Sequence, residues 1–223
     1  MTPDDVMARL EQSGSAQTSK TYARHGIKGA MFGVSYAVLG KLTKAIKVDQ
    51  ALAEKLWATG NHDARILATT IADVGTNGWK QLETWALVSD NYVLSDAVAR
   101  LVARTPHARA TAEAWTKSAG EYLGQCGWTV FAALAATDKT IADADWLTLL
   151  ARIEKTIGNA KNRVRHAMNG ALIAIGGRST KLKTAAIAAA KRIGKVEVDH
   201  GDTSCETPDA VGYIAKLWAR KKA

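Results

Sequence analysis

Proline, cysteine and long apolar runs are all scarce in this sequence. Its 223 residues include three prolines, two phenylalanines and two cysteines. With so few prolines, little of the backbone is forced out of helix. Cys126 and Cys205 are too few and too far apart for a disulfide framework, which favours a reducing compartment. No apolar run approaches the roughly 18–20 residues that span a bilayer, and the N-terminus MTPDDVMARL lacks the apolar core of a signal peptide. We therefore expect a soluble, cytoplasmic protein without membrane association.

Acidic residues are also in short supply. The chain has 21 aspartates and glutamates against 30 lysines and arginines, so its formal net charge is +9. Between Arg152 and Lys195 there are eleven lysines or arginines and a single acid, Glu154. A polyanionic partner such as nucleic acid would offset the self-repulsion of such a segment. The alternative is a solvated basic face that keeps the protein soluble.

Helix starts are marked by capping residues. Thr2-Pro3 is followed by two aspartates, which combines an N-cap, a proline in the first turn and charges that favour the positive end of the helix dipole. Thr105-Pro106 and Thr207-Pro208-Asp209 repeat this pattern, and Asp49 and Asn61 are further candidate caps. The apolar residues between these marks have helical spacing. We expect about twelve helices, with only the run 196–198 extended.

Tryptophan positions indicate the architecture. Trp57, Trp85, Trp115 and Trp146 lie 28, 30 and 31 residues apart, each in or near a long amphipathic helix. A helix pair repeated about every 30–45 residues is typical of an α-solenoid. The sequence therefore predicts an all-α fold, an α-α superhelix (solenoid) of repeated helix pairs over residues 1–223 as one domain. Such stacking generates a concave face suited to an extended partner.

One predicted helix carries a polar stripe. Asn162, Arg165, His166 and Asn169 lie at positions i, i+3, i+4 and i+7, so they share a face. Amide, guanidinium and imidazole groups suit a phosphate backbone, which accepts hydrogen bonds and attracts cations. A solvated helix face is the alternative. We predict DNA contacts from this stripe and from the neighbouring cations of the same basic segment, which are Arg163, Lys181 and Lys183.

Other polar clusters are less specific. Tyr92 and Asp96 lie four apart on a predicted helix and present an aromatic ring beside a carboxylate, although Asp96 could instead cap a helix and Tyr92 belong to the core. The loop 198–205 holds a histidine, two aspartates and a cysteine, but lacks zinc-finger spacing, so a polar loop with Asx turns explains it better than a metal site. No phosphate-binding glycine loop or GxSxG elbow is present. We expect no metal and no cofactor.

Several longer strings carry a family resemblance. They run through nearly the whole chain: FGVSYAVLGKLTKAIK, LAEKLWATGNHDARILATTIAD, DNYVLSDAV, NRVRHAMNGALIAIG, IGKVEVDHGDTSC and PDAVGYI. Together they resemble the bacterial DNA alkylation repair family, the AlkD-like DNA glycosylases of HEAT-like repeat fold, and the last two strings look like a divergent branch. The resemblance implies a crescent whose basic concave face grips duplex DNA, and excision of cationic N3- or N7-alkylated purines.

The resemblance also implies particular site residues. The resembled glycosylases use a tryptophan, an aspartate four residues later and an arginine one helix further on. In this chain Tyr92 stands at the tryptophan position and Asp96 keeps the aspartate, whereas GEYLGQCGW offers no arginine. Within that string we take Gln125 and Trp128 as candidate DNA contacts, and Tyr22 is the candidate for an N-terminal aromatic on the DNA face.

Three functions follow from these observations. The first is a monomeric protein that binds double-stranded DNA and hydrolyses the N-glycosidic bond of cationic alkylpurines. In it, Asp96 would stabilise the oxocarbenium-like sugar and orient water, and Tyr92 would provide an aromatic wall. The second is a non-catalytic binder of damaged or branched DNA. The third is a HEAT-type scaffold for an acidic protein segment.

Overall fold

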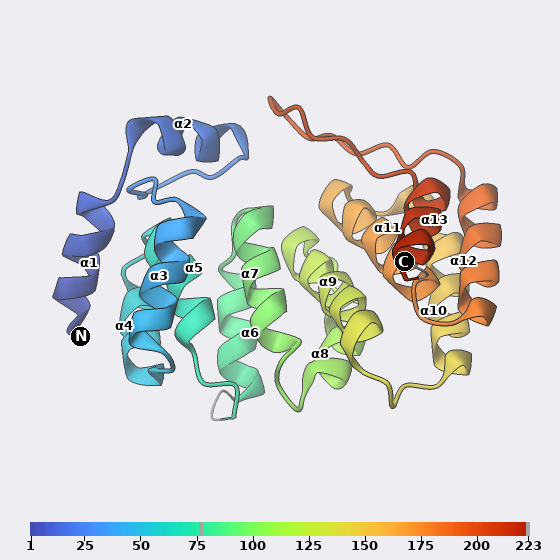
Figure 1. The fold of residues 1–223 in the computed structure, drawn as a ribbon, viewed down its shortest axis with the longest axis horizontal. Helices are drawn as coiled ribbons and strands as arrows, with labels where there is room; N and C mark the ends of the chain where they lie inside the picture. Colours follow the sequence, from blue (N-terminus) through green and yellow to red (C-terminus); the bar gives the residue numbers. More distant parts are fainter. Residues whose placement is uncertain (76–77, 222–223) are drawn as a thin grey trace. The chain divides into compact units, whose positions relative to one another are not determined.

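The computed structural model describes residues 1–75 and 78–221, and in them it is all-α (Figure 1). The chain divides into two compact units, and residues 1–106 with 200–203 form unit 1. Its helices are α1 (Pro3–Gln12), α2 (Ala16–Arg24), α3 (Tyr36–Ile46), α4 (Gln50–Ala58), α5 (His62–Ile71), α6 (Trp79–Leu87) and α7 (Tyr92–Val102). Each helix in the described chain is too short or too polar to serve as a transmembrane span.

Residues 107–199 and 204–223 form unit 2. Its helices are α8 (Ala108–Trp115), α9 (Glu121–Thr137), α10 (Asp143–Thr156), α11 (Asn162–Gly176), α12 (Thr180–Ile193) and α13 (Ala210–Arg220), with one 3-10 turn, η1 (Ile157–Asn159). The sequence predicts one domain over 1–223. In a repeat protein each repeat contacts only its neighbours, so compact units can be distinguished within a chain of similar repeats.

Helices in each unit form two layers. In unit 1, α5 packs against α3, α4 and α7, and α6 packs against α7. In unit 2, α11 packs against α9, α12 and α13, while α10 and α12 contact each other. The odd-numbered helices α3, α5 and α7 therefore lie side by side, as do α9, α11 and α13 (Figure 1). This is the arrangement of stacked helix pairs that the repeat pattern predicts.

The four periodic tryptophans are all core residues. Trp57 and Trp85, on α4 and α6, stack face to face with ring centroids 4.2 Å apart and planes 2° apart. In unit 2, Trp115 and Trp146 are 1% and 0% exposed. Equivalent positions of neighbouring repeats thus contribute the same large side chain to the core, which is why the period is visible in the sequence.

Helix caps follow the sequence with two corrections. Thr2, Asp49 and Asn61 each cap a helix by accepting a backbone N–H, as predicted. Thr105 does not cap α8. Its hydroxyl donates to a carbonyl at the end of α7, so α8 starts later, at Ala108. The helix α13 is capped by Asp209 rather than by Thr207.

The described residues contain one isolated bridge, Gly14 with Val34, and no strand. The run 196–198, which we expected to be extended, belongs to the irregular segment 194–209 between α12 and α13 and pairs with no strand there. This segment is called the α12–α13 connector below.

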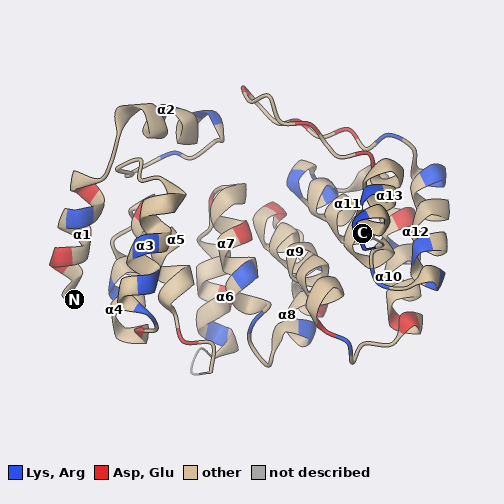
Figure 2. Ribbon diagram, in the orientation of Figure 1, with Lys and Arg blue, Asp and Glu red and all other residues tan. Residues whose placement is uncertain are grey.

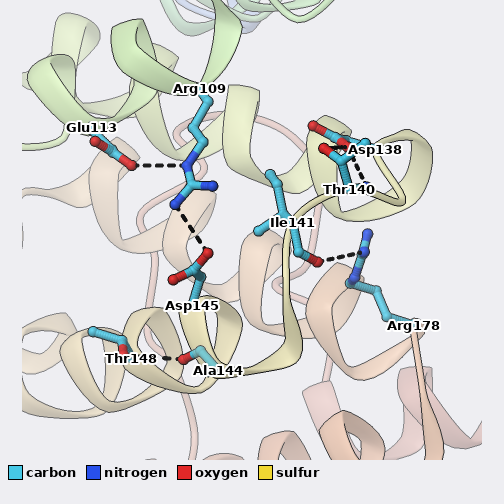
Figure 3. A network of polar contacts seen from close by, with 9 residues as sticks. All are labelled: Arg109, Glu113, Asp138, Thr140, Ile141, Ala144, Asp145, Thr148 and Arg178. Carbon is cyan, nitrogen blue, oxygen red and sulfur yellow. Dashed lines mark hydrogen bonds and ion pairs between the residues drawn. The ribbon is translucent and has the colours of Figure 1, made fainter.

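Several arginines of unit 2 serve the fold. Arg109 bridges Glu113, one turn along α8, and Asp145 of α10 at 3.0 Å (Figure 3). Arg178 donates to the carbonyl oxygens of Ala135 and Ile141 near the end of α9, and its guanidinium lies 4.8 Å from the centroid of the Trp146 ring. These cations join neighbouring repeats and satisfy carbonyls at a helix end that have no partner within the helix.

The loop before α3 is fixed by one buried carboxylate. Asp63, at the start of α5, is fully buried and accepts the backbone N–H groups of Phe32, Gly33 and Val34 at 2.7, 3.1 and 2.9 Å. Its place in the first turn of α5 also puts the negative charge at the positive end of the helix dipole. The loop 27–35 is thereby attached to α5.

We predict that Asp63→Ala lowers the free energy of unfolding by about 3 kcal/mol or more, because three backbone donors, two of them buried, lose a charged acceptor. Asp63→Asn should have a smaller effect, since its carbonyl oxygen can still accept. Urea denaturation followed by circular dichroism measures both changes. A loss below about 1 kcal/mol in the alanine variant would contradict this role.

Candidate DNA-binding residues and the site around Asp96

The predicted pair Tyr92 and Asp96 lies on one face of α7 in unit 1. Asn91 caps this helix by accepting the N–H of Leu94, which fixes its first turn at Tyr92. The side chains of Tyr92 and Asp96 are both partly exposed, whereas Leu94 and Val98 on the opposite face are buried. Asp96 is therefore neither the cap of α7 nor a core residue.

A histidine that the sequence did not single out contacts Tyr92. His25 ends α2, and its Nδ1 shares a hydrogen bond with the Tyr92 hydroxyl. The two rings meet edge to face with centroids 6.0 Å apart. The contact joins residues 67 apart in the chain, so no local pattern could indicate it. It fixes the orientation of the Tyr92 ring beside the Asp96 turn.

Further aromatic residues surround this part of unit 1. Tyr22, predicted to face DNA, is 8% exposed, and its hydroxyl donates to the carbonyl of Val34. Its ring meets Tyr36 and His62 edge to face, with centroids 6.4 and 5.4 Å apart. Burial raises the pKa of Tyr22 and lowers the pKa of His62, so both stay neutral at pH 7. Tyr22 thus supports Tyr36, which is 52% exposed.

The side chain of Tyr36 stands among charged groups. Desolvation raises the pKa of its hydroxyl most strongly, Arg100 lowers it, and Asp96 and Asp63 raise it. The hydroxyl therefore remains a hydrogen-bond donor at neutral pH. The structure brings Tyr36, Asp96 and Arg100 into one electrostatic neighbourhood, of which the sequence predicted only Asp96.

In unit 2, the predicted polar stripe of α11 holds the α12–α13 connector. Asn162 donates to the carbonyl of Asp199 and accepts its N–H, both at 2.8 Å. Asn169 is 2% exposed and donates to the carbonyl of Pro208 at 2.9 Å. Arg165 donates to three carbonyls, of Glu197, Gly158 and Ala160. His166, between them, is partly exposed.

This arrangement explains why two asparagines occur on a helix that they do not favour. Asparagine is a poor helix former, because its amide competes for backbone groups. On α11 each amide instead satisfies backbone groups of an irregular segment about 40 residues later. Asn162, Arg165 and Asn169 thus each form hydrogen bonds within the protein.

The other predicted contacts in unit 2 differ in accessibility. Lys181 is exposed, and Lys183 is partly exposed with its ammonium 5.0 Å from the centroid of the Trp218 ring. Arg163 is partly exposed. Gln125 and Trp128 are both 2% exposed, and Trp128 lies under the guanidinium of Arg152. Lys181, Lys183 and Arg163 therefore offer more surface to a partner than do the two residues of α9.

The position where the resemblance implies an arginine is closed by packing. A Cβ added to Gly124 would lie 3.1 Å from Cγ2 of Val164, because α9 and α11 approach closely there. The adjacent Gln125 is buried. No cation takes the place of the missing arginine on this turn of α9, and a longer side chain at position 124 would crowd the side chain of Val164.

The loop 198–205 does not gather metal ligands. In the part of the chain that the structure describes, no three His, Cys, Asp or Glu side chains are placed to hold a metal ion. Thr203 donates its hydroxyl to the carbonyl of His200, which closes a turn at the tip of the connector.

Comparisons with known proteins identify relatives over nearly the whole chain. The sequence profile described as DNA alkylation repair enzyme matches residues 6–213. The chain is 28% identical to the uncharacterized protein Lmo0209 of Listeria monocytogenes over 228 residues, which cover 100% of both chains. It is also 28% identical to Lin0241 of Listeria innocua, with 97% of each chain covered.

A solved structure is similar over almost the full length. It is described as a new family of proteins related to the HEAT-like repeat DNA glycosylases with affinity for branched DNA structures. The TM-score is 0.92 at 30% identity, covering 99% of this chain and 95% of that chain. The predicted fold, an α-α superhelix of HEAT-like repeats, is confirmed.

The hydrogen bonds of Asn162 lead to a prediction. In Asn162→Ala the amide N–H of Asp199 loses its acceptor, so its native-state hydrogen exchange should become about tenfold faster. Lys161→Ala, at the exposed N-cap position next to it, is the matched control and should leave that exchange rate unchanged. Equal exchange at Asp199 in both variants would show that α11 does not hold the connector.

Proposed function

Because this chain belongs to the DNA alkylation repair enzyme family, in a divergent AlkD-like branch, we propose that it is a DNA-binding protein that grips duplex segments, including the arms of branched DNA. One observation carries the proposal. Unit 2 has 18 lysines and arginines against 10 aspartates and glutamates, a net charge of +8, whereas unit 1 has 12 against 11, a net charge of +1. Nearly all of the excess positive charge is therefore in one unit.

The accessible part of this charge comes mostly from lysines. Glu154, the only acid between Arg152 and Lys195, forms an ion pair with Arg192. Exposed lysines lie along α10, at the start of α11 and on α12 (Figure 2): Lys155, Lys161, Lys181 and Lys191. Lysine ammonium groups contact phosphates as point charges without reading bases, so this surface supports binding that depends little on sequence.

We predict that the double variant Lys181→Gln/Lys183→Gln weakens duplex binding regardless of DNA sequence. The slope of log K against log salt concentration should become less steep by about 0.9 for each phosphate that the variant no longer neutralises. Fluorescence anisotropy between low and moderate salt measures this slope for a duplex and for a four-way junction.

The matched control is Lys117→Gln/Lys139→Gln, which removes the same charge from exposed positions of unit 2 outside the basic segment. If both double variants change the slope equally, only net charge matters and the surface of α12 is not the contact. A steep slope with duplex DNA also distinguishes this function from a scaffold for an acidic protein segment.

Base excision is a second candidate function, favoured by the surroundings of Asp96. A cationic alkylpurine is already a good leaving group, so the protein would need only to stabilise the oxocarbenium-like sugar and position water. The partly exposed Asp96 carboxylate suits the first task, and the ring of Tyr92, oriented by His25, suits a cationic base. With Gly124 and a buried Gln125 where the arginine would stand, we expect slow excision.

We predict that Asp96→Asn lowers any excision of N7-methylguanine by about 10²–10³, the usual effect of removing one preorganised electrostatic group. Duplex binding should stay the same or improve, because a negative charge next to a polyanion is removed. A single-turnover assay with protein in excess measures the rate. Undiminished excision by Asp96→Asn would refute its role. No excision by the wild type, together with tight binding, would leave DNA binding as the sole function.

A further inference from the structure

The face of α7 that carries Tyr92 and Asp96 continues into two arginines. Tyr92, Asp96, Arg100 and Arg104 follow one another at intervals of four residues, so they form a stripe that turns slowly around the helix. Arg100 lies within α7 and Arg104 directly after its end, and both are exposed. Four residues of helix span about 6 Å, so Arg100 lies one turn from Asp96.

Both arginines line a groove within unit 1. The groove is bounded by α3, α5 and α7 and has a volume of about 390 Å³. Its floor is apolar, with Leu39, Ile66 and Leu101 all buried. Its polar groups are hydroxyls and guanidiniums, and no carboxylate is among the lining residues that the structure describes. The lining therefore offers donors and positive charge to a ligand.

The hydroxyl groups of the groove are held in place. Those of Thr43 and Thr70 share a hydrogen bond of 2.7 Å across α3 and α5. That of Thr69 donates to the carbonyl of Ile66. The ring of Tyr36 contacts the ring of Tyr22, and its hydroxyl keeps its proton at neutral pH for the reasons given above. The hydroxyls of Thr43 and Thr70 also donate to carbonyls one turn back in their own helices, so their protons are already used. Tyr36 is therefore the hydroxyl that can donate to a ligand, and its fixed ring limits the side-chain entropy lost on binding.

The guanidiniums of Arg100 and Arg104 differ in what holds them within the groove. Arg104 donates to the carbonyl of Thr69 at 3.1 Å, which positions it at one end of the groove. Partial desolvation there lowers the pKa of its guanidinium, although an arginine remains charged at neutral pH. Arg100 acts on Tyr36 electrostatically. In the described chain neither guanidinium forms an ion pair with a carboxylate. Two cations one turn apart, without an ion-pair partner in that part of the chain, suit an external anion.

We propose that this groove binds one phosphodiester group of a DNA strand, with Arg100 and Arg104 donating to its nonbridging oxygens and Tyr36 donating through its hydroxyl. Guanidiniums match phosphate oxygens in geometry as well as in charge. The proposal rests on the proposed DNA-binding function and deepens it. A phosphate fixed one turn from Asp96 determines which nucleotide of that strand lies beside the Asp96 carboxylate, so the groove is a positioning site.

The test compares Arg100→Gln with Arg9→Gln. Arg9 is an exposed arginine of α1 in the same unit, outside the groove, so the two variants lose the same charge. With duplex DNA, Arg100→Gln should weaken binding about tenfold at low salt and make the salt slope less steep by about 0.9, whereas Arg9→Gln should change neither measurably. Equal behaviour of the two variants overturns the proposal while leaving DNA binding in place.

Further measurements separate the remaining outcomes. Arg100→Lys keeps the point charge but not the fork of donors, so it should retain the salt slope and lose part of the affinity. An unchanged melting temperature in all three variants shows that the fold is intact.

If wild-type protein binds no DNA, the proposed function and this proposal both fail. Millimolar inorganic phosphate at constant ionic strength should bind only weakly. Saturation by inorganic phosphate in wild type but not in Arg100→Gln, without any change in the DNA salt slope, would assign the groove to free phosphate instead.

Discussion

The carboxylate of Asp63 fixes the loop that positions the candidate site residues of unit 1. It accepts three consecutive backbone N–H groups of the loop before α3 while sitting in the first turn of α5. The loop so fixed supplies the carbonyl of Val34 to the hydroxyl of Tyr22, and it leads directly into Tyr36 at the start of α3. The aromatic residues near Asp96 thus depend on a buried charge that has no contact with the surface.

Close packing has the corresponding role in unit 2. Where α9 crosses α11, Gly124 leaves room for Val164 only because it has no side chain. A side chain at that position would crowd Val164 of α11, and α11 carries the residues that hold the connector. The absence of the arginine is therefore built into the packing of this chain, and restoring it by a single substitution should cost stability through overpacking. This is the physical reason why we expect the protein to bind DNA but to excise bases slowly.

Much of the fold could be predicted because its signals are local. The stripe of Leu52, Leu56 and Trp57 is buried as its helical spacing indicates, and Asn61 caps α5 as its position before the apolar run suggests. The polar stripe of α11 was equally visible, but its partners were not. The carbonyls that Asn162 and Asn169 bind are 37 and 39 residues away, in a segment without regular structure. A backbone carbonyl has no sequence signature, so helical spacing indicated the shared face of these residues but not their hydrogen bonds to the connector.

The contrast between local signals and long-range contacts also explains why the sequence predicted only part of the site around Asp96. Tyr92 and Asp96 are a local pair. His25 contacts Tyr92, Asp96 acts electrostatically on Tyr36, and Tyr36 in turn contacts Tyr22, all between helices far apart in the chain. Side chains that meet only through the stacking of repeats follow from the structure and not from spacing along the sequence.

Arginines and lysines of unit 2 differ in what they contact: most arginines bond within the protein, whereas the exposed lysines are available to a partner. In unit 2, five arginines donate to carboxylates, carbonyls or a hydroxyl of the protein itself: Arg109, Arg152, Arg165, Arg178 and Arg192. The planar guanidinium suits such multiple, fixed contacts between repeats. The exposed cations of the basic segment are mainly lysines, whose flexible, hydrated ammonium groups contact phosphates without fixing their position. A surface of this kind can hold DNA without fixing which nucleotide lies at a given position on the protein. To fix which nucleotide lies beside a given residue, at least one guanidinium must be available to a phosphate. The proposed groove provides one, because Arg100 forms no ion pair among the described residues.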